Sequence, residues 1–195
     1  YLLQIKNEND SDAMFDLGLL YDEQEKYDLA EKYYLMAVKY NNGSAMTNLG
    51  LIYENQKKYD LAEKYYLMAV EEESDTGMYN LGLLYDNQKK YTLAEKYYLM
   101  AIQKNYSDAM YNLALLYDNQ EKFSLAEKYY LMAIKENDSD AMYNLALIYD
   151  IRKNILLQKS IISWLLKPMT VMLHLIWRYC MTIKRNIISQ KSIIL

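Results

Sequence analysis

Few side chains of this chain could act as a nucleophile, a general base or a metal ligand. His174 is the only histidine and Cys180 the only cysteine, so the sequence offers neither a histidine-based dyad nor a cluster of metal ligands. No glycine-rich phosphate loop is present, and acidic runs such as residues 71–73 are typical of solvated surface. We therefore predict that the protein is not an enzyme and needs no cofactor, metal or small-molecule substrate.

Polar side chains instead recur at a fixed spacing, and their chemistry suits hydrogen bonding rather than catalysis. Each amide of an asparagine column offers both a donor and an acceptor. The asparagine column comprises Asn48, Asn80, Asn112 and Asn144, with Asp16 at the first position. Beside it stand a mostly aromatic column (Phe15, Thr47, Tyr79, Tyr111, Tyr143), an acidic column (Asp22, Glu54, Asp86, Asp118, Asp150) and a leucine column (Leu19, Leu51, Leu83, Leu115, Leu147).

These columns belong to a repeat that fills most of the chain. The string LAEKYYLMA occurs four times, beginning at Leu29, Leu61, Leu93 and Leu125. Full repeats run over residues 11–42, 43–74, 75–106 and 107–138, and the first helix of a fifth covers 139–150. A period of about 32 residues falls within the range of about 20 to 50 residues that predicts supersecondary units stacked on one another.

Each repeat is predicted to form two helices. In the fourth repeat, Ser107 and Asp108 are expected to cap a first helix whose buried stripe is Ala109, Leu113, Leu116 and Tyr117. The second helix is expected to open on a capping box, Ser124 with Glu127, matched by Asp28 with Glu31, Asp60 with Glu63 and Thr92 with Glu95. Its predicted stripe is Leu125, Ala126, Tyr129, Tyr130 and Ala133. Small residues, glycine or alanine, are expected to let the helices approach closely, and Tyr33, Tyr34 and their counterparts are expected to pack between neighbouring repeats.

The pattern resembles the tetratricopeptide repeat and its Sel1-like variant. The resemblance lies in Leu113-Ala114-x-x-Tyr117 followed by Ala126, Tyr130 and Ala133, and it covers residues 1–150. Two features depart from these families: the repeat period is shorter than usual, and the customary proline after the second helix is missing. The resemblance implies an all-α fold, a solenoid of stacked antiparallel helix pairs that forms a right-handed superhelix.

In such solenoids the first helix of each repeat lines a concave groove. The resemblance therefore places in this groove Asn48, Asn80, Asn112, Asn144, Tyr79, Tyr111, Tyr143, Asp86 and Asp118. An asparagine ladder would match the backbone of an extended peptide, and the acidic column would attract lysine and arginine in it. The predicted function is that of an adaptor or scaffold that binds a protein or peptide through an extended, basic segment.

Three other interpretations stay open at this point. The chain could be the substrate-recruiting arm of a larger enzyme, or a degenerate gene product without a selected function. The asparagine and acidic columns could also be ordinary solvated residues that recent duplication has repeated.

The charge is divided unevenly along the chain, and this bears on possible partners. Residues 1–150 carry 14 basic and 26 acidic residues, which gives 14 − 26 = −12, whereas residues 151–195 carry 8 basic residues and no acid. An acidic body argues against nucleic acid as a partner. No membrane span is expected, because the apolar stretch 161–181 is interrupted by Lys167, Pro168, His174 and Arg178. The chain starts at Tyr1 without a targeting signal, so we expect a cytoplasmic fragment of a longer protein.

The motif ends after Asp150, but its period persists. The string QKSII begins at Gln158 and again at Gln190, which is the same spacing as that from Leu29 to Leu61. If one nucleotide is lost near codon 151, the genetic code forces an aspartate at positions 170 and 182 and a leucine at position 180, as the repeat requires. One junction, Leu173 with His174, cannot supply the expected methionine. We predict that residues 151–195 are a frameshifted continuation of the repeats, the alternatives being a genuine divergent terminus or a membrane anchor.

Overall fold

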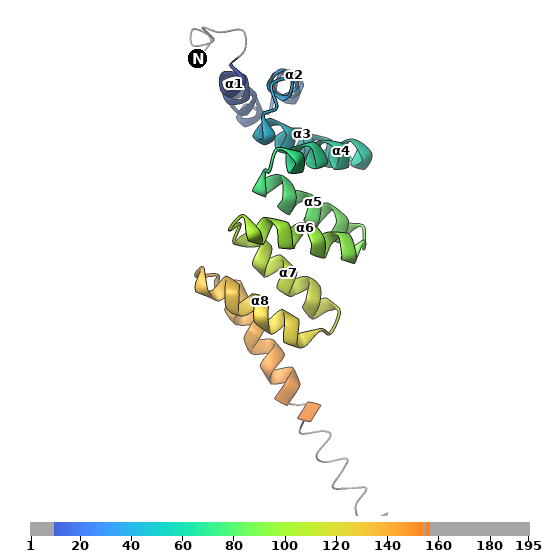
Figure 1. Ribbon diagram of the computed structural model, residues 1–195, viewed down its shortest axis with the longest axis vertical. Helices are drawn as coiled ribbons and strands as arrows, with labels where there is room; N and C mark the ends of the chain where they lie inside the picture. Colours follow the sequence, from blue (N-terminus) through green and yellow to red (C-terminus); the bar gives the residue numbers. More distant parts are fainter. Residues whose placement is uncertain (1–9, 154, 157–195) are drawn as a thin grey trace, which may run out of the picture. The chain divides into compact units, whose positions relative to one another are not determined.

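The computed structural model describes residues 10–153 and 155–156, and all regular secondary structure in that part of the chain is helical (Figure 1). The chain divides into two compact units, one up to Leu145 and one from Ala146. The helices of the first unit are α1 (Ser11–Glu23), α2 (Tyr27–Val38), α3 (Gly43–Asn55), α4 (Tyr59–Glu71), α5 (Asp75–Asn87), α6 (Tyr91–Gln103), α7 (Asp108–Asn119) and α8 (Phe123–Lys135), followed by helical residues 139–145. In the second unit, residues 146–153 and 155–156 are helical. The all-α prediction is confirmed.

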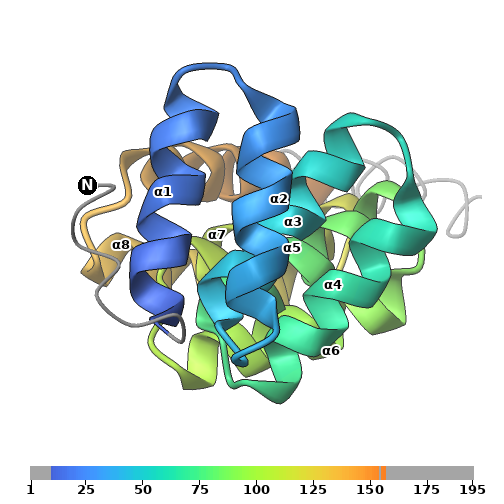
Figure 2. The same cartoon turned by 90° about the horizontal axis from the view of Figure 1, so that it is seen from above.

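Consecutive helices of the first unit pack as pairs, as Figure 2 shows for α1 and α2. The second helix of each pair also packs against the first helix of the next pair, and the first helices of neighbouring pairs contact each other. The pairs are α1 with α2, α3 with α4, α5 with α6, and α7 with α8, so each predicted repeat is one pair. Such nearest-neighbour packing is the arrangement expected of a solenoid.

The interior of each pair is built around a tyrosine that faces a small residue. Tyr34, Tyr66, Tyr98 and Tyr130 are fully buried. A Cβ atom on Gly50 would lie 2.3 Å from Cε1 of Tyr66, and one on Gly18 would lie 2.4 Å from Cε1 of Tyr34. Glycine therefore lets the ring lie directly on the partner helix, which confirms the expected close approach.

The expectation that Tyr33 and Tyr34 pack between neighbouring repeats covers only part of their contacts, because both also pack within their own repeat. Tyr34 covers Gly18 of its own repeat, and Tyr33 stacks on Tyr21 of the same repeat with ring centroids 5.4 Å apart. In an antiparallel hairpin, residues equally far from the turn meet, and both pairs are centred on the turn after α1. The hydroxyl of Tyr34 reaches the next repeat, where it accepts a hydrogen bond from Asn48.

The stacked tyrosines are covered on both outer faces by lysines. The ammonium of Lys26 lies 6.0 Å from the ring centroid of Tyr21, and that of Lys32 lies 5.8 Å from the ring of Tyr33. The same arrangement of two lysines around two rings recurs in the next three repeats. Cation–π attraction of this kind adds to the stability of the stacked pairs.

The helices end at left-handed residues that recur every 16 positions. These residues have φ between 57° and 68° and none is glycine: Glu25, Asn41, Lys57, Glu73, Lys89, Asn105, Glu121 and Asn137. At Lys57 the backbone N–H donates to the carbonyl of Glu54 (2.8 Å), and the next N–H, of Lys58, donates to that of Tyr53 (2.8 Å). This double hydrogen bond is the Schellman motif. Lys153 stands at the next position of the series but is helical, so the series ends where the repeat sequence ends.

The predicted capping boxes of the second helices are wrong. These helices begin two residues earlier than expected, after Lys26, Lys58, Lys90 and Lys122, and none of these residues makes a side-chain cap. Lys58 follows the left-handed Lys57 in a non-helical conformation (φ −90°, ψ 64°) and the helix begins directly after it, so Asp60 lies within the first turn, as do its counterparts. The glutamates of the predicted boxes have another use, because Glu31 and Glu63 accept hydrogen bonds from Tyr53 (2.6 Å) and Tyr85 (2.8 Å) of the following repeats.

The predicted cap at Ser107 is also wrong. Its backbone is helical (φ −64°, ψ −39°) and its side chain makes no capping bond. The first helices are capped one residue earlier in the repeat, by Asp10, Asn42, Ser74 and Asp138. The fourth repeat has Tyr106 at that position, and tyrosine cannot cap. Leu125, predicted in a buried stripe, is 40% exposed, whereas the stripe of α7 is buried as predicted.

Candidate functional site

The predicted asparagine column lies half-buried on the first helices of the repeats, which we call the A-helix face: α1, α3, α5, α7 and residues 139–145. Three of its amides donate from Nδ2 to a tyrosine hydroxyl of the preceding repeat. Asn48 donates to Tyr34 (3.1 Å), Asn112 to Tyr79 (2.8 Å) and Asn144 to Tyr111 (3.0 Å). These asparagines therefore tie neighbouring repeats together, which leaves their carbonyl oxygens as acceptors.

Asn80 differs from the other three asparagines. Its side chain makes no hydrogen bond with any residue that the structure describes. The residue 33 positions before it is Thr47 rather than a tyrosine, and Thr47 is buried, with its hydroxyl 3.0 Å from the carbonyl of Gly43. The hydroxyl of Tyr66 donates to Glu54 instead (2.9 Å). The amide of Asn80 thus keeps all its donors and acceptors.

The aromatic column is engaged at two of its three predicted site residues. The ring of Tyr79 lies 6.2 Å from that of Tyr98 and 5.0 Å from that of Tyr106, and Tyr111 lies 6.0 Å from Tyr130. Tyr143 is 66% exposed. Tyr79 and Tyr111 consequently serve in packing and in the ties to asparagine as well as lining the A-helix face.

Four members of the acidic column lie beside the buried tyrosines, near the ends of α1, α3, α5 and α7: Asp22, Glu54, Asp86 and Asp118. Burial raises the pKa of the Asp86 and Asp118 carboxyls. Burial, opposed by the hydrogen bond from Asn48, raises the pKa of Tyr34 to about 12. No cation of the described part of the chain forms an ion pair with Asp22, Glu54, Asp86 or Asp118. These four carboxyls therefore form a row without cationic partners among the described residues.

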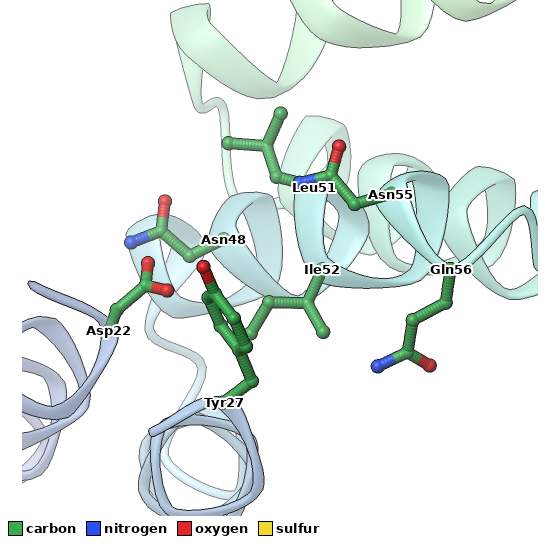
Figure 3. A pocket seen from close by; sticks show the side chains of 7 residues that line it. All are labelled: Asp22, Tyr27, Asn48, Leu51, Ile52, Asn55 and Gln56. Atoms are coloured by element: carbon green, nitrogen blue, oxygen red, sulfur yellow. The ribbon is translucent and has the colours of Figure 1, made fainter. Parts of the chain in front are cut away.

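A cleft of about 560 Å³ brings three of the predicted columns together between the first and second repeats. It is lined by Asp22, Tyr27, Asn48, Leu51, Ile52, Asn55 and Gln56 (Figure 3). In Figure 3 the carboxylate of Asp22 points toward the hydroxyl end of Tyr27, while Asn48, Leu51 and Ile52 extend from α3.

Sequence reasoning missed Tyr27, which stands at the start of α2 and is 52% exposed. Its counterparts Tyr59 and Tyr91 are 46% and 43% exposed. The signal was present, since an aromatic residue precedes each copy of the repeated string by two positions. This aromatic residue stands next to the turn and outside the first helices, to which the predicted groove was confined.

The remaining predictions concern residues outside the described part of the chain, and the presence of metal sites and membrane spans. His174, Cys180 and almost all of the predicted frameshifted segment, residues 151–195, lie outside the described residues. Within the described part, no group of three or more histidine, cysteine, aspartate or glutamate side chains is arranged to hold a metal ion. None of the helices described there has the length and apolar character needed to cross a membrane.

Comparison with known sequences identifies repeats over nearly the whole described region. One family model described as tetratricopeptide repeat matches residues 15–77 and 111–155, and a second matches residues 75–103. No curated protein sequence matches the chain.

Solved structures with the same arrangement of helices include two proteins of the Sel1-like type. A Sel1 repeat protein from Oxalobacter formigenes is 27% identical with a TM-score of 0.66, over 76% of this chain and 65% of that one. A protective antigen of uropathogenic Escherichia coli with an SLR fold is 21% identical with a TM-score of 0.64, over 70% of this chain and 33% of that one. PilF of Pseudomonas aeruginosa is 21% identical with a TM-score of 0.63, over 75% of this chain and 72% of that one. The chain thus spans less than two thirds of the first two proteins.

Proposed function

The chain belongs to the tetratricopeptide repeat family, and from this premise we propose that it is an adaptor that binds an extended, lysine- and arginine-rich segment of another protein along its A-helix face. Repeats of this family are commonly protein-interaction modules and are generally not catalytic. The proposal concerns the location of the binding face and the chemistry of the segment.

The observation that carries the proposal is the open amide of Asn80 on a face where the four carboxylates from Asp22 to Asp118 have no cationic partner among the described residues. A half-buried amide with free donors and acceptor can pair with the N–H and C=O groups of a peptide backbone whatever its side chains. The neighbouring carboxylates favour a cationic segment, because unpaired acidic groups attract it over a distance and speed its association.

The ladder that the sequence suggests therefore has members with two different roles. Asn112 donates to Tyr79 and also to the carbonyl of Asp108 (3.2 Å), so both of its N–H groups are used. Asn48, Asn112 and Asn144 can offer a peptide mainly their carbonyl oxygens. Asn80 keeps its full hydrogen-bonding capacity, and we expect it to contribute most to binding.

The test uses a fluorescein-labelled ten-residue peptide in which lysine alternates with serine, titrated with the 195-residue chain by fluorescence anisotropy. Asn80→Ala should weaken binding about fivefold, because one net hydrogen bond contributes on the order of 1 kcal/mol. The matched control is Asn112→Ala, which should weaken the tie between repeats while changing peptide affinity less. A peptide of serine and alanine should bind far more weakly.

Two outcomes would count against this function. One is equal affinity of the parent and Asn80→Ala for the lysine peptide. The other is equal affinity for the charged and uncharged peptides, or no binding of either peptide. Raising the salt concentration should also slow association, since attraction between exposed charges is screened.

A further inference from the structure

We propose that the cleft between the first and second repeats binds the side chain of a single arginine of the partner. The inference rests on the proposed function for the source of that arginine, but it concerns one cleft and one side chain. Its volume of about 560 Å³ falls within the range of about 300 to 1,000 Å³ typical of sites that enclose small molecules.

The polar end of the cleft is rich in acceptors that lack a strong donor. The hydroxyl of Tyr34 lies 3.5 Å from Oδ2 of Asp22, at the limit of a hydrogen bond, whereas the corresponding contact of Tyr66 with Glu54 is 2.9 Å. Asn48 donates its Nδ2 to Tyr34, so its Oδ1 stays an acceptor. The carboxylate of Asp22 is therefore available to a donor from outside the chain.

The closest lysine in sequence does not neutralise Asp22. The ammonium of Lys26 donates to Oε1 of Gln24 (2.8 Å) and lies over the ring of Tyr21. Asp22 forms no ion pair with any described residue. The negative charge of the cleft is thus uncompensated within the described part of the chain.

The remaining walls fit the stem and the plane of an arginine. Tyr27 is half exposed at the edge of the cleft and offers a ring on which a guanidinium can stack. Leu51 and Ile52 of α3 also line the cleft and can contact the methylene stem (Figure 3). Acidic, aromatic and apolar groups in one cleft suit a side chain that has a cationic head on an apolar stem.

Arginine fits this set of groups better than lysine. Its guanidinium carries five N–H donors in a plane and can engage a carboxylate with two parallel hydrogen bonds. The cleft offers the Asp22 carboxylate together with the amide oxygens of Asn48 and Asn55. A lysine ammonium has three donors on a compact charge and does not stack as a plane.

The test measures the binding of an arginine derivative to this cleft in the absence of a peptide. The 195-residue chain is labelled with ¹³C at isoleucine δ1-methyl groups and titrated with N-acetyl-arginine N′-methylamide. Ile52 reports this cleft specifically, because the corresponding residues of the next two repeats are Leu84 and Leu116. Ile102 and Ile134 lie on second helices and serve as internal references.

The expected result is a saturable shift of the Ile52 methyl signal. The citrulline analogue, which has the same shape without the charge, should not produce it, and the lysine analogue should bind more weakly. Asp22→Asn should weaken arginine binding about fivefold or more, as expected for the loss of a charged partner at a partly exposed site. Asp60→Asn removes the same charge from the surface of α4, away from the cleft, and should change the affinity less than about twofold.

Three results would overturn the inference: an Ile52 signal that does not shift, an equal shift with citrulline, or equal effects of Asp22→Asn and Asp60→Asn. Tyr27→Ala provides a second variant, and circular dichroism checks that both variants fold. Failure here is distinct from failure of the proposed function, because the effect of Asn80→Ala on the lysine peptide is measured separately.

Discussion

Replacing Gly50 by alanine should lower the free energy of unfolding by about 2 kcal/mol, as expected when a carbon atom is forced into a packed interior. The new Cβ would lie 2.3 Å from Cε1 and 2.4 Å from Cδ1 of Tyr66, whereas an ordinary contact begins at 3.4 Å. The ring must therefore withdraw by 3.4 − 2.3 = 1.1 Å, although it is fully buried.

Three contributions set the size of the effect. Forcing an extra carbon into a packed interior costs about 1 to 3 kcal/mol. Moving the ring also weakens the hydrogen bond from Tyr66 to Glu54, which contributes about 1 kcal/mol. Alanine offsets part of this, since it is a better helix former than glycine by about 1 kcal/mol. The loss stays moderate because the fourth repeat has Ala114 at this position and still buries Tyr130 fully.

Urea denaturation followed by circular dichroism measures the change. Gly43→Ala is the matched control: it is the same substitution in the same helix, where the new Cβ would lie 3.4 Å from Cβ of Glu72. That variant should be as stable as the parent or slightly more stable. If the two variants are equally stable, the packing of Tyr66 against Gly50 does not limit stability and the reasoning is refuted.

Four further predictions concern stability and the coding sequence. Chains of two, three and four repeats should unfold with free energies that rise almost linearly with repeat number in urea titrations, and equal stability of two and four repeats would contradict the solenoid. Lys57→Gly should stabilise the chain by about 0.5 kcal/mol, because glycine adopts the left-handed backbone conformation of this position without steric strain. Lys58→Gly, at φ −90°, should destabilise the chain. Stability should hold up to pH 10 and fall between about pH 10 and 12, because the neutral form of Tyr34 is favoured in the fold, and denaturation midpoints of Tyr34→Phe should fall less steeply over that range. Sequencing the coding DNA around codon 151 should show a second reading frame that continues the repeat, and its absence would end that hypothesis.

The helix pairs could be predicted from the sequence because they depend on local information. A fixed repeat period with an apolar stripe in each half specifies two helices joined by a short turn, and the antiparallel pairing then brings Gly18 to Tyr34. The place of a turn such as residues 119–122 could be predicted as well, but the left-handed conformation within it could not. The left-handed residues are lysine, glutamate and asparagine, and only glycine would have given a clear signal.

The sequence also could not predict which amides of the asparagine column are hydrogen-bonded and which is free. Whether an amide is free depends on which tyrosine hydroxyl of the preceding repeat lies beside it, 14 positions earlier for Asn48 and 33 positions earlier for Asn112 and Asn144. The apolar pattern does not specify which hydroxyl that is. Asn80 and Asn112 are therefore equivalent in the repeat, although one has a free amide and the other donates to Tyr79.

Thr47 has a consequence for where a ligand can sit along the chain. A segment bound to a surface of identical repeats would have several registers of equal energy, one repeat apart, and could slide among them. Asn80 has Thr47 beside it in the column where Asn112 and Asn144 have tyrosines, and its free amide makes one register different from the rest. A difference confined to one repeat can thus favour one register of a bound segment over the others.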